Sequence, residues 1–167
     1  MVACAAVVRN AIPLWRKPDP GFHRFADSLT PGSSGIFLVA GDAVPEGAFI
    51  AEIALHDQRE DHIVLRASKM LANINWNFTV YQPLFSNPRD VASFLDQLHV
   101  TTVMVAYRST RPHIAQLTEA LIENPRVWKE EPSDQRFVRR FQRIGPVPAG
   151  AVHIRIPIDN KYFQLDQ

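Results

Sequence analysis

Two carboxylates, Asp42 and Glu46, directly follow an apolar run and are the first candidates for chemistry in this sequence. The run, residues 36–40, has the composition of a strand buried on both faces, and a helical pattern begins at Pro45. A strand, a short polar loop and a helix form the first half of a βαβ unit, where α/β folds place their ligands. Asp42 and Glu46 could therefore bind a sugar hydroxyl or a metal. Equally, they could cap the helix by accepting hydrogen bonds from its first N–H groups.

Two cations and a hydroxyl lie at the end of the next apolar segment. Residues 62–66 are predicted to form a second strand, which ends in Arg66 and leads into Ser68 and Lys69. If the two strands are neighbours, these three side chains lie beside the two carboxylates. There they could hold a phosphate or a carboxylate. Alternatively, an ion pair with one of the two acidic residues could fix the junction between strand and helix.

An aromatic segment follows these strand ends. Within residues 67–87, residues 70–72 fit one helical turn, and residues 73–83 have the composition of a long loop, a kind of segment that is often functional. Within it, Trp76, Phe78 and Tyr81 could stack on a sugar ring, or they could pin the loop onto the core.

Other catalytic patterns do not occur in the sequence. The six histidines show no HxH or HExxH spacing, and the closest group, His56 with His62, is typical of a solvated turn. There is no GxGxxG or GxxxxGK-S/T phosphate loop, and Ser33 lacks the GxSxG context of a nucleophile elbow. Cys4 lies in an apolar run, which favours an inert thiol. We therefore predict no catalytic residue, no metal and no cofactor.

Apolar periodicity predicts the elements that position these residues. Helical spacing predicts helices at 22–28, 45–56, 88–98 (with Asn87 as N-cap) and 112–123. Buried or alternating runs predict strands at 36–40, 62–66 and 100–107, a hairpin of 127–131 with 137–144, and an edge strand at 152–158. This order predicts an α/β fold: a three-layer-like sandwich with a mostly parallel sheet of about four to six strands, ending in a C-terminal β-hairpin and edge strand.

Length and composition predict one folded core. The 167 residues are enough for a single domain of ordinary size. Prolines and glycines divide the chain into an N-terminal apolar stub with a Pro/Gly-rich lead-in (1–35), an α/β core (36–145) and a linker with the edge strand (146–167). The net charge of +1 argues against a nucleic-acid partner, and the single cysteine excludes an internal disulfide.

The first eight residues are apolar or small and permit two interpretations. They are too few to span a bilayer, which takes about 20 residues, and no basic residue precedes them as in a secretory signal. They could form a buried first element of the fold. They could also be the end of a membrane helix, since Trp15, Arg16 and Lys17 would suit its interfacial flank.

Three short segments resemble a known family. They are residues 47–54 (GAFIAEIA), residues 62–72 (HIVLRASKMLA) and residues 75–77 (NWN). This pattern is similar to the soluble C-terminal domains of bacterial multi-pass membrane glycosyltransferases that use lipid-phosphate-linked sugars, and the likeness covers roughly residues 36–107. It implies an extracytoplasmic α/β domain after a final membrane helix. Because the catalytic carboxylate of such enzymes lies between membrane helices, the resemblance also implies a domain that is not catalytic alone.

These observations lead to one main hypothesis and two alternatives. The main hypothesis is a non-catalytic accessory domain of, or derived from, a membrane glycosyltransferase. Its partners would be that membrane domain and a sugar or phosphate ligand, on the extracytoplasmic side. The first alternative is a free-standing, cytoplasmic enzyme or binding protein for a small anionic ligand at the strand ends. The second is a protein–protein interaction domain that uses the arginine-bearing hairpin at Arg139, Arg140 and Arg143. The candidate ligand-binding residues are Asp42, Glu46, Arg66, Ser68, Lys69 and Trp76.

Overall fold

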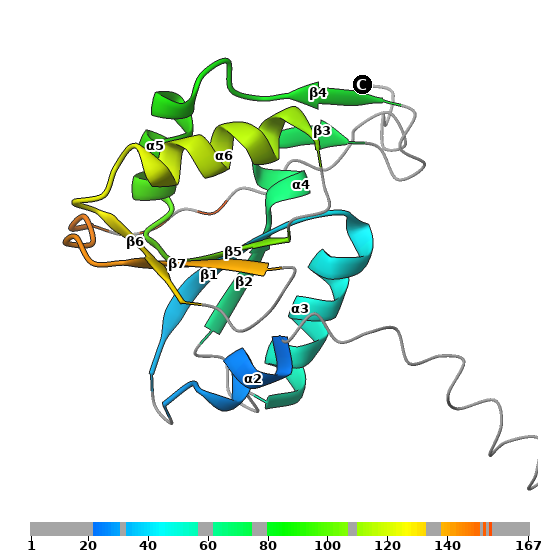
Figure 1. The fold of residues 1–167 in the computed structure, drawn as a ribbon, viewed down its shortest axis with the longest axis vertical. Helices are drawn as coiled ribbons and strands as arrows, with labels where there is room; N and C mark the ends of the chain where they lie inside the picture. Colours follow the sequence, from blue (N-terminus) through cyan, green and yellow to red (C-terminus); the bar gives the residue numbers. More distant parts are fainter. Residues whose placement is uncertain are drawn as a thin grey trace, which may run out of the picture.

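The computed structural model describes residues 22–30, 33–56, 62–74, 80–106, 110–132 and 138–150, with Val152 and Ile154. The elements are labelled as in Figure 1. In chain order they are α2 (Phe22–Asp27), β1 (Gly35–Ala40), α3 (Ala43–His56), β2 (His62–Arg66), α4 (Ala67–Met70), β3 (Ala72–Ile74), β4 (Tyr81–Pro83), α5 (Pro88–Gln97), β5 (Val100–Ala106), α6 (Pro112–Ile122), β6 (Trp128–Glu131) and β7 (Val138–Arg143).

A five-stranded sheet with the order β2-β1-β5-β7-β6 forms the middle of the molecule. Strand β1 pairs in parallel with β2 and with β5, which places Leu38 beside Leu65 on one side and beside Val103 on the other. The hairpin of β6 and β7 continues the sheet in antiparallel fashion, and β6 is its edge. The predicted α/β class, the strand number and the C-terminal edge hairpin are therefore confirmed.

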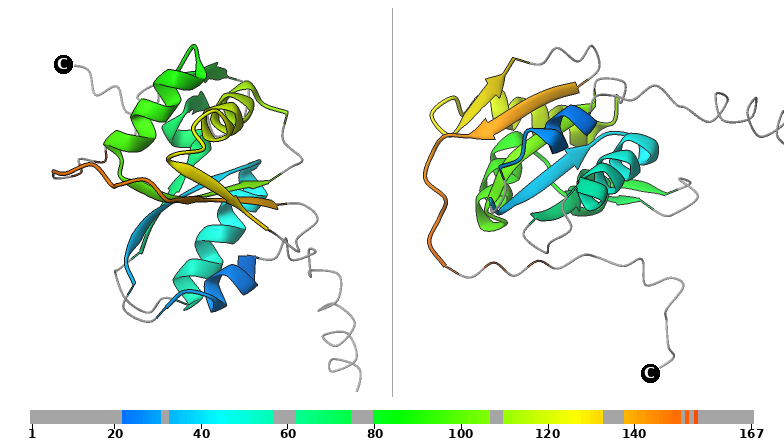
Figure 2. Two further views of the ribbon diagram at one scale, coloured as in Figure 1. Left: turned by 60° about the vertical axis from the view of Figure 1, so that its left-hand side comes forward. Right: turned by 90° about the horizontal axis from the view of Figure 1, so that it is seen from below.

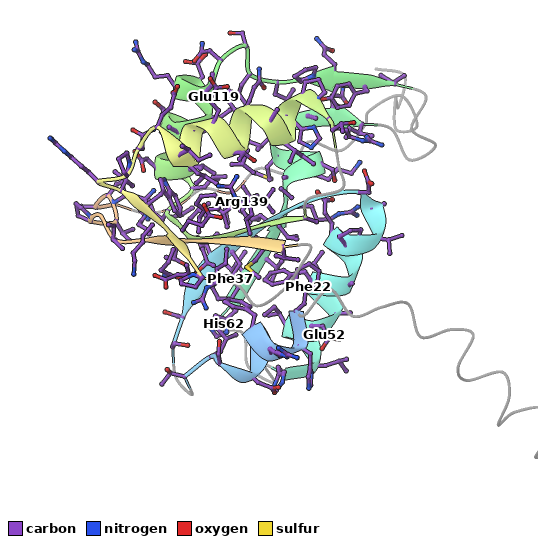
Figure 3. The ribbon with its side chains drawn as sticks, in the orientation of Figure 1. Phe22, Phe37, Glu52, His62, Glu119 and Arg139 are labelled. Atoms are coloured by element: carbon purple, nitrogen blue, oxygen red, sulfur yellow. The ribbon has the colours of Figure 1, made fainter. Side chains whose placement is uncertain are left out.

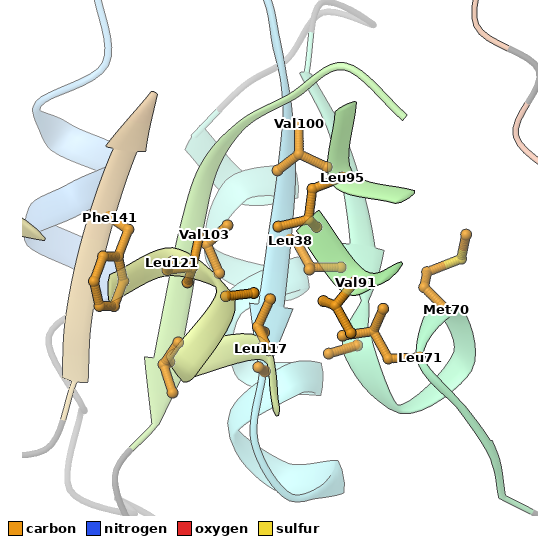
Figure 4. Close-up of a cluster of buried hydrophobic side chains, with 14 of the residues drawn as sticks. Leu38, Met70, Leu71, Val91, Leu95, Val100, Val103, Leu117, Leu121 and Phe141 are labelled. Atoms are coloured by element: carbon orange, nitrogen blue, oxygen red, sulfur yellow. The ribbon is translucent and has the colours of Figure 1, made fainter. Parts of the chain in front are cut away.

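Helices cover both faces of this sheet, so that the fold has three layers (Figure 2). Helices α4, α5 and α6 lie on one face, over a core built largely from aliphatic side chains such as Leu38, Leu95 and Leu117 (Figure 4). Helices α2 and α3 lie on the other face, over an aromatic core in which Phe22 and Phe25 contact Phe49. Burial of these large apolar side chains on both sides is the main force that holds the layers together.

The region predicted as a long loop contains regular structure. Residues 72–74 and 81–83 form the antiparallel pair β3–β4, and the helical turn predicted at 70–72 is instead α4, which ends at Met70. Strands of three residues are too short for an alternating pattern to reveal them.

The predicted elements at the two ends of the chain fall largely outside the described residues. The N-terminal stub lies there completely. Of the edge strand predicted at 152–158, only Val152 and Ile154 are described, and neither is in a strand. Within the described ranges, no helix has both the length and the apolar character needed to cross a membrane.

Candidate functional site

The three parallel strands end at one edge of the sheet, where the chain changes direction. From β1 the chain passes through α3 on one face to reach β2, and from β2 it crosses the other face to reach β5. Strands β1 and β5 therefore form a topological switch point, the position where open α/β sheets leave a crevice for ligands. The strand ends approach closely there, because a Cβ atom on Gly41 would lie 3.1 Å from the Cβ of Ala106.

Glu46 joins the ends of β1 and β2. It lies in the first turn of α3 and is completely buried. Its Oε2 accepts a hydrogen bond from Arg66 Nε at 2.9 Å, and its Oε1 accepts one from the Ser68 backbone N–H at 2.9 Å. The Ser68 hydroxyl also donates to Oε2. Of the two interpretations given for these residues, the structure contains the ion pair that fixes the junction.

The electrostatics of Glu46 reflect the same contacts. Burial raises the pKa of the Glu46 carboxyl, while the hydrogen bonds from Ser68 and Arg66 act in the opposite direction. The partners of this carboxylate, Arg66 and Ser68, both belong to the junction, so Glu46 connects α3 to β2 and α4. A buried carboxylate that already accepts three hydrogen bonds has little capacity left for a ligand.

The Asp42 side chain has a different partner from that of Glu46. Its Oδ1 is 3.7 Å from Nε of Arg111, which precedes α6. The Asp42 side chain is 54% exposed, in contrast to the buried Glu46, and the Arg111 side chain is 29% exposed, so the Asp42 carboxylate is open to solvent. The pair thus bridges β1 and α6 at the switch point.

Tyr81 and His113 extend this pair into a connected group. The Arg111 guanidinium carbon is 5.8 Å from the centroid of the Tyr81 ring. The Tyr81 hydroxyl accepts a hydrogen bond from the His113 backbone N–H at 3.1 Å and lies 3.0 Å from His113 Nδ1. His113 is fully buried. This burial is the main cause, and the positive charge of Arg111 the second, of a lowering of the His113 pKa from 6.5 to about 4. The Asp42 carboxylate has a smaller effect, which raises this pKa. His113 is therefore a neutral ring at pH 7.

The remaining sequence candidates lie elsewhere. Lys69 donates from Nζ to the carbonyl of Ile74 at 2.8 Å, which closes the connection from α4 to β3. Trp76 lies outside the described residues. The structure therefore joins the side chains of Glu46, Arg66 and Ser68, and it gives those of Asp42 and Lys69 other partners.

The arginines of the β6–β7 hairpin are held within the domain. Arg139 donates to both Glu130 oxygens, at 2.7 and 2.6 Å, and its guanidinium lies over the Phe141 ring. Arg143 donates to the Val100 carbonyl and to Asp96. Arg140 lies 4.8 Å over the ring of Phe25, on the face covered by α2. The guanidinium groups of the hairpin thus contact other residues of the same domain.

A cavity of about 520 Å³ lies beside α6, and neither Asp42 nor Glu46 lines it. Its walls are mostly aliphatic, and its charged members come from α6 and β7, including Glu119 and Arg139 (Figure 3). The complete lining is Val105, Ala106, Ile114, Ala115, Thr118, Glu119, Ile122, Glu123 and Arg139.

Sequence reasoning found Asp42 and named Tyr81 among the aromatic residues, but it missed Arg111 and His113. Neither of these has a motif around it, and only the closure of β5 against β1 brings them to Asp42. Similarity to known proteins adds no independent assignment of this group. No protein-family model, no curated protein and no solved structure matches the chain.

Proposed function

We propose that this chain is a non-catalytic α/β domain of, or derived from, a membrane glycosyltransferase, and that it contacts sugar or phosphate groups at the switch point around Asp42 and Arg111. The observation that carries this proposal is a difference in burial between the two acidic side chains at the end of β1. The Glu46 carboxylate is buried and accepts hydrogen bonds from Arg66 and Ser68, whereas the Asp42 carboxylate is 54% exposed and lies 3.7 Å from Arg111.

The exposed pair has the chemistry that a sugar phosphate requires. A guanidinium binds phosphate oxygens through several N–H donors, and a carboxylate accepts hydrogen bonds from sugar hydroxyls. The ring of Tyr81 lies beside Arg111 and offers an apolar face to a sugar ring. At 3.7 Å the Asp42–Arg111 contact is longer than an ordinary charge-assisted hydrogen bond.

The non-catalytic assignment is supported by the state of the titratable groups. Glu46 is engaged by Arg66 and Ser68, and neutral His113 is enclosed against Tyr81. The link to a membrane glycosyltransferase is supported by the three sequence segments described above. Two of them form α3 and the β2–α4 connection, which are the elements that Glu46 joins.

Calorimetric titration of the full chain with a hexose 1-phosphate and with inorganic phosphate tests the proposal. The expected result is saturable binding that weakens at least tenfold in Arg111→Gln. Arg89→Gln, on the exposed side of α5, is the matched control and should bind as the wild type does. Absence of binding by the wild type, or equal binding by Arg111→Gln, would refute the proposed contact surface.

A titration with a small dicarboxylate, run in the same way, distinguishes this proposal from the alternative of a free-standing binding protein. A small dicarboxylate or another anion without a sugar would then bind more tightly than the sugar phosphate, because Asp42 would contribute no hydroxyl contact. The proposed function predicts the reverse order.

A further inference from the structure

Two helices on the aromatic side of the sheet present matching pairs of polar side chains. His23 and Asp27 lie four residues apart on α2, and Glu52 and His56 lie four residues apart on α3. Residues with this spacing share one face of a helix. Each helix therefore contributes one imidazole and one carboxylate to the line along which the two helices meet.

The aromatic core beneath fixes this alignment. Phe22 of α2 packs edge-on against Phe49 of α3, with ring centroids 5.0 Å apart, and Phe25 stacks on the same ring at 5.6 Å. Figure 3 shows Phe22 and Glu52 close to this junction of the two helices. The polar residues are neighbours of this packed core in sequence, so the packing that buries the phenylalanines brings the polar pairs together.

Asp27 is the centre of the group. Its Oδ1 lies 2.5 Å from His56 Nε2, and its Oδ2 lies 3.3 Å from His23 Nε2. Glu52 Oε2 lies 3.5 Å from the other ring nitrogen of His23, Nδ1. One potential ligand atom from each of His23, Asp27 and His56 lies within 4.8 Å of the other two.

We infer that His23, Asp27 and His56 form a binding site for a divalent transition-metal ion of the Zn²⁺ type, which would clamp α2 onto α3. Imidazole nitrogen and carboxylate oxygen are ligands that Zn²⁺ accepts, and ligands about 2.1 Å from a tetrahedral ion lie about 3.3 Å from one another. The His23–Asp27 pair already has this separation. His56 would move outward by about 1 Å from its hydrogen bond with Asp27, which an exposed side chain can do.

Glu52 completes the arrangement as a positioning residue. When one ring nitrogen of a histidine binds a metal, the other usually donates to a carboxylate, which fixes the ring and strengthens the ligand. Glu52 has this relation to His23 through Nδ1. Three protein ligands leave a coordination position for water or for a further group.

A metal clamp has a structural consequence for α2. This helix has six residues, too few to be stable without packing. An ion held by His23 and Asp27 on α2 and by His56 on α3 would add a direct connection between the two elements. Metal binding should therefore stabilise the folded chain as a whole.

The test is a titration of the untagged, chelator-treated full chain with Zn²⁺ by calorimetry and with Co²⁺ by visible absorption. A Cys4→Ser background removes the thiol as a competing ligand. We expect one equivalent to bind, Co²⁺ to give the absorption band of a low-symmetry site, and Tm to rise by roughly 5 to 10 °C at a hundredfold excess of Zn²⁺ over Kd.

Variants assign the binding to these residues. His56→Ala and His23→Ala should abolish it, and Glu52→Gln should weaken it about 10- to 100-fold. His99→Asn is the matched control: it removes a distant histidine, and asparagine tolerates the positive φ of 52° at that position. Because the altered side chains are exposed or half-buried and none belongs to the hydrophobic core, circular dichroism should show every variant folded. Binding that persists in both His23→Ala and His56→Ala, or a wild type that binds neither ion, would overturn the inference.

Discussion

The carboxylate of Glu46 and the guanidinium of Arg66 meet at 2.9 Å where α3 leaves β1 and where β2 ends. Glu46 is fully buried and the Arg66 side chain is 35% exposed, so the pair reaches from the core to the surface. This contact fixes the relative position of two parallel strand ends. The Asp42–Arg111 pair lies at the same edge of the sheet, where the parallel strands end.

Loss of the Glu46 carboxylate should destabilise the fold strongly. Glu46→Ala removes the acceptor of Arg66 and of the Ser68 N–H, and leaving a buried donor without its acceptor costs about 1–3 kcal/mol. Chemical denaturation measures the loss. Glu119→Ala, on the exposed side of α6, should change the free energy of unfolding by less than about 0.5 kcal/mol. Equal effects of the two substitutions would show that Glu46 does not hold the junction.

Stability should fall between pH 6.5 and pH 4 because of His113. The folded state keeps this ring neutral down to about pH 4, whereas the unfolded chain binds the proton below about pH 6.5. The contribution of neutral His113 to the free energy of unfolding is therefore complete above pH 6.5. It is lost as the pH falls to 4, and the total loss is about 3 kcal/mol. Urea unfolding of the wild type and of His113→Phe across this range measures it.

The difference in unfolding free energy between these two proteins should change by about 3 kcal/mol over that pH interval. His99→Asn provides the control, because this substitution removes a histidine outside the buried group. A constant difference between the wild type and His113→Phe would contradict the assignment of this proton to His113.

Two arginines of β7 should differ in their contribution to stability. Arg143 has a side chain only 3% exposed and donates to the Val100 carbonyl and to Asp96, so Arg143→Met should cost about 3 kcal/mol. Arg139 pairs with Glu130 nearer the surface, and Arg139→Met should cost about 1 kcal/mol or less. Thermal unfolding compares the two variants. A larger loss in Arg139→Met would contradict this account of the hairpin.

Removal of the Asp42 carboxylate should change ligand preference more than stability. In Asp42→Ala, binding of a hexose 1-phosphate should weaken several-fold, because a hydroxyl contact is lost. Inorganic phosphate should bind at least as well as before, because the negative charge beside Arg111 is gone. Competition between the two ligands in calorimetry gives the ratio. An unchanged ratio would exclude Asp42 from sugar contact.

The sequence was most informative where apolar periodicity was long. Strand β2 was predicted with its exact bounds, and α5 begins after Asn87 as predicted, since the Asn87 side chain accepts a hydrogen bond from the Asp90 N–H. The β3–β4 pair was missed because its strands have three residues each, and Pro83 ends one of them. Such short pairs form through their neighbours in the fold, here α4, and leave no pattern of their own.

The candidate site was predictable only as far as strand order could be inferred. Neighbouring strands β1 and β2 were expected, so the meeting of Glu46 with Arg66 was among the predicted alternatives. Arg111 reaches Asp42 only because β5 pairs with β1 on its other side, and no local pattern encodes that pairing. His23 and His56 escaped a search for ligand spacing for the same reason, since two helices far apart in the sequence supply them.

Chemical-shift mapping by NMR can locate a bound sugar phosphate on the domain. The ¹⁵N-labelled full chain is titrated with a hexose 1-phosphate, and the backbone amide signals are followed residue by residue. We predict saturable shifts that are largest at the switch point of the sheet, at Gly41, Asp42, Tyr81, Arg111 and His113. Shifts concentrated elsewhere, for example along the aliphatic cavity beside α6, or no saturable shift at all, would contradict the proposed contact surface.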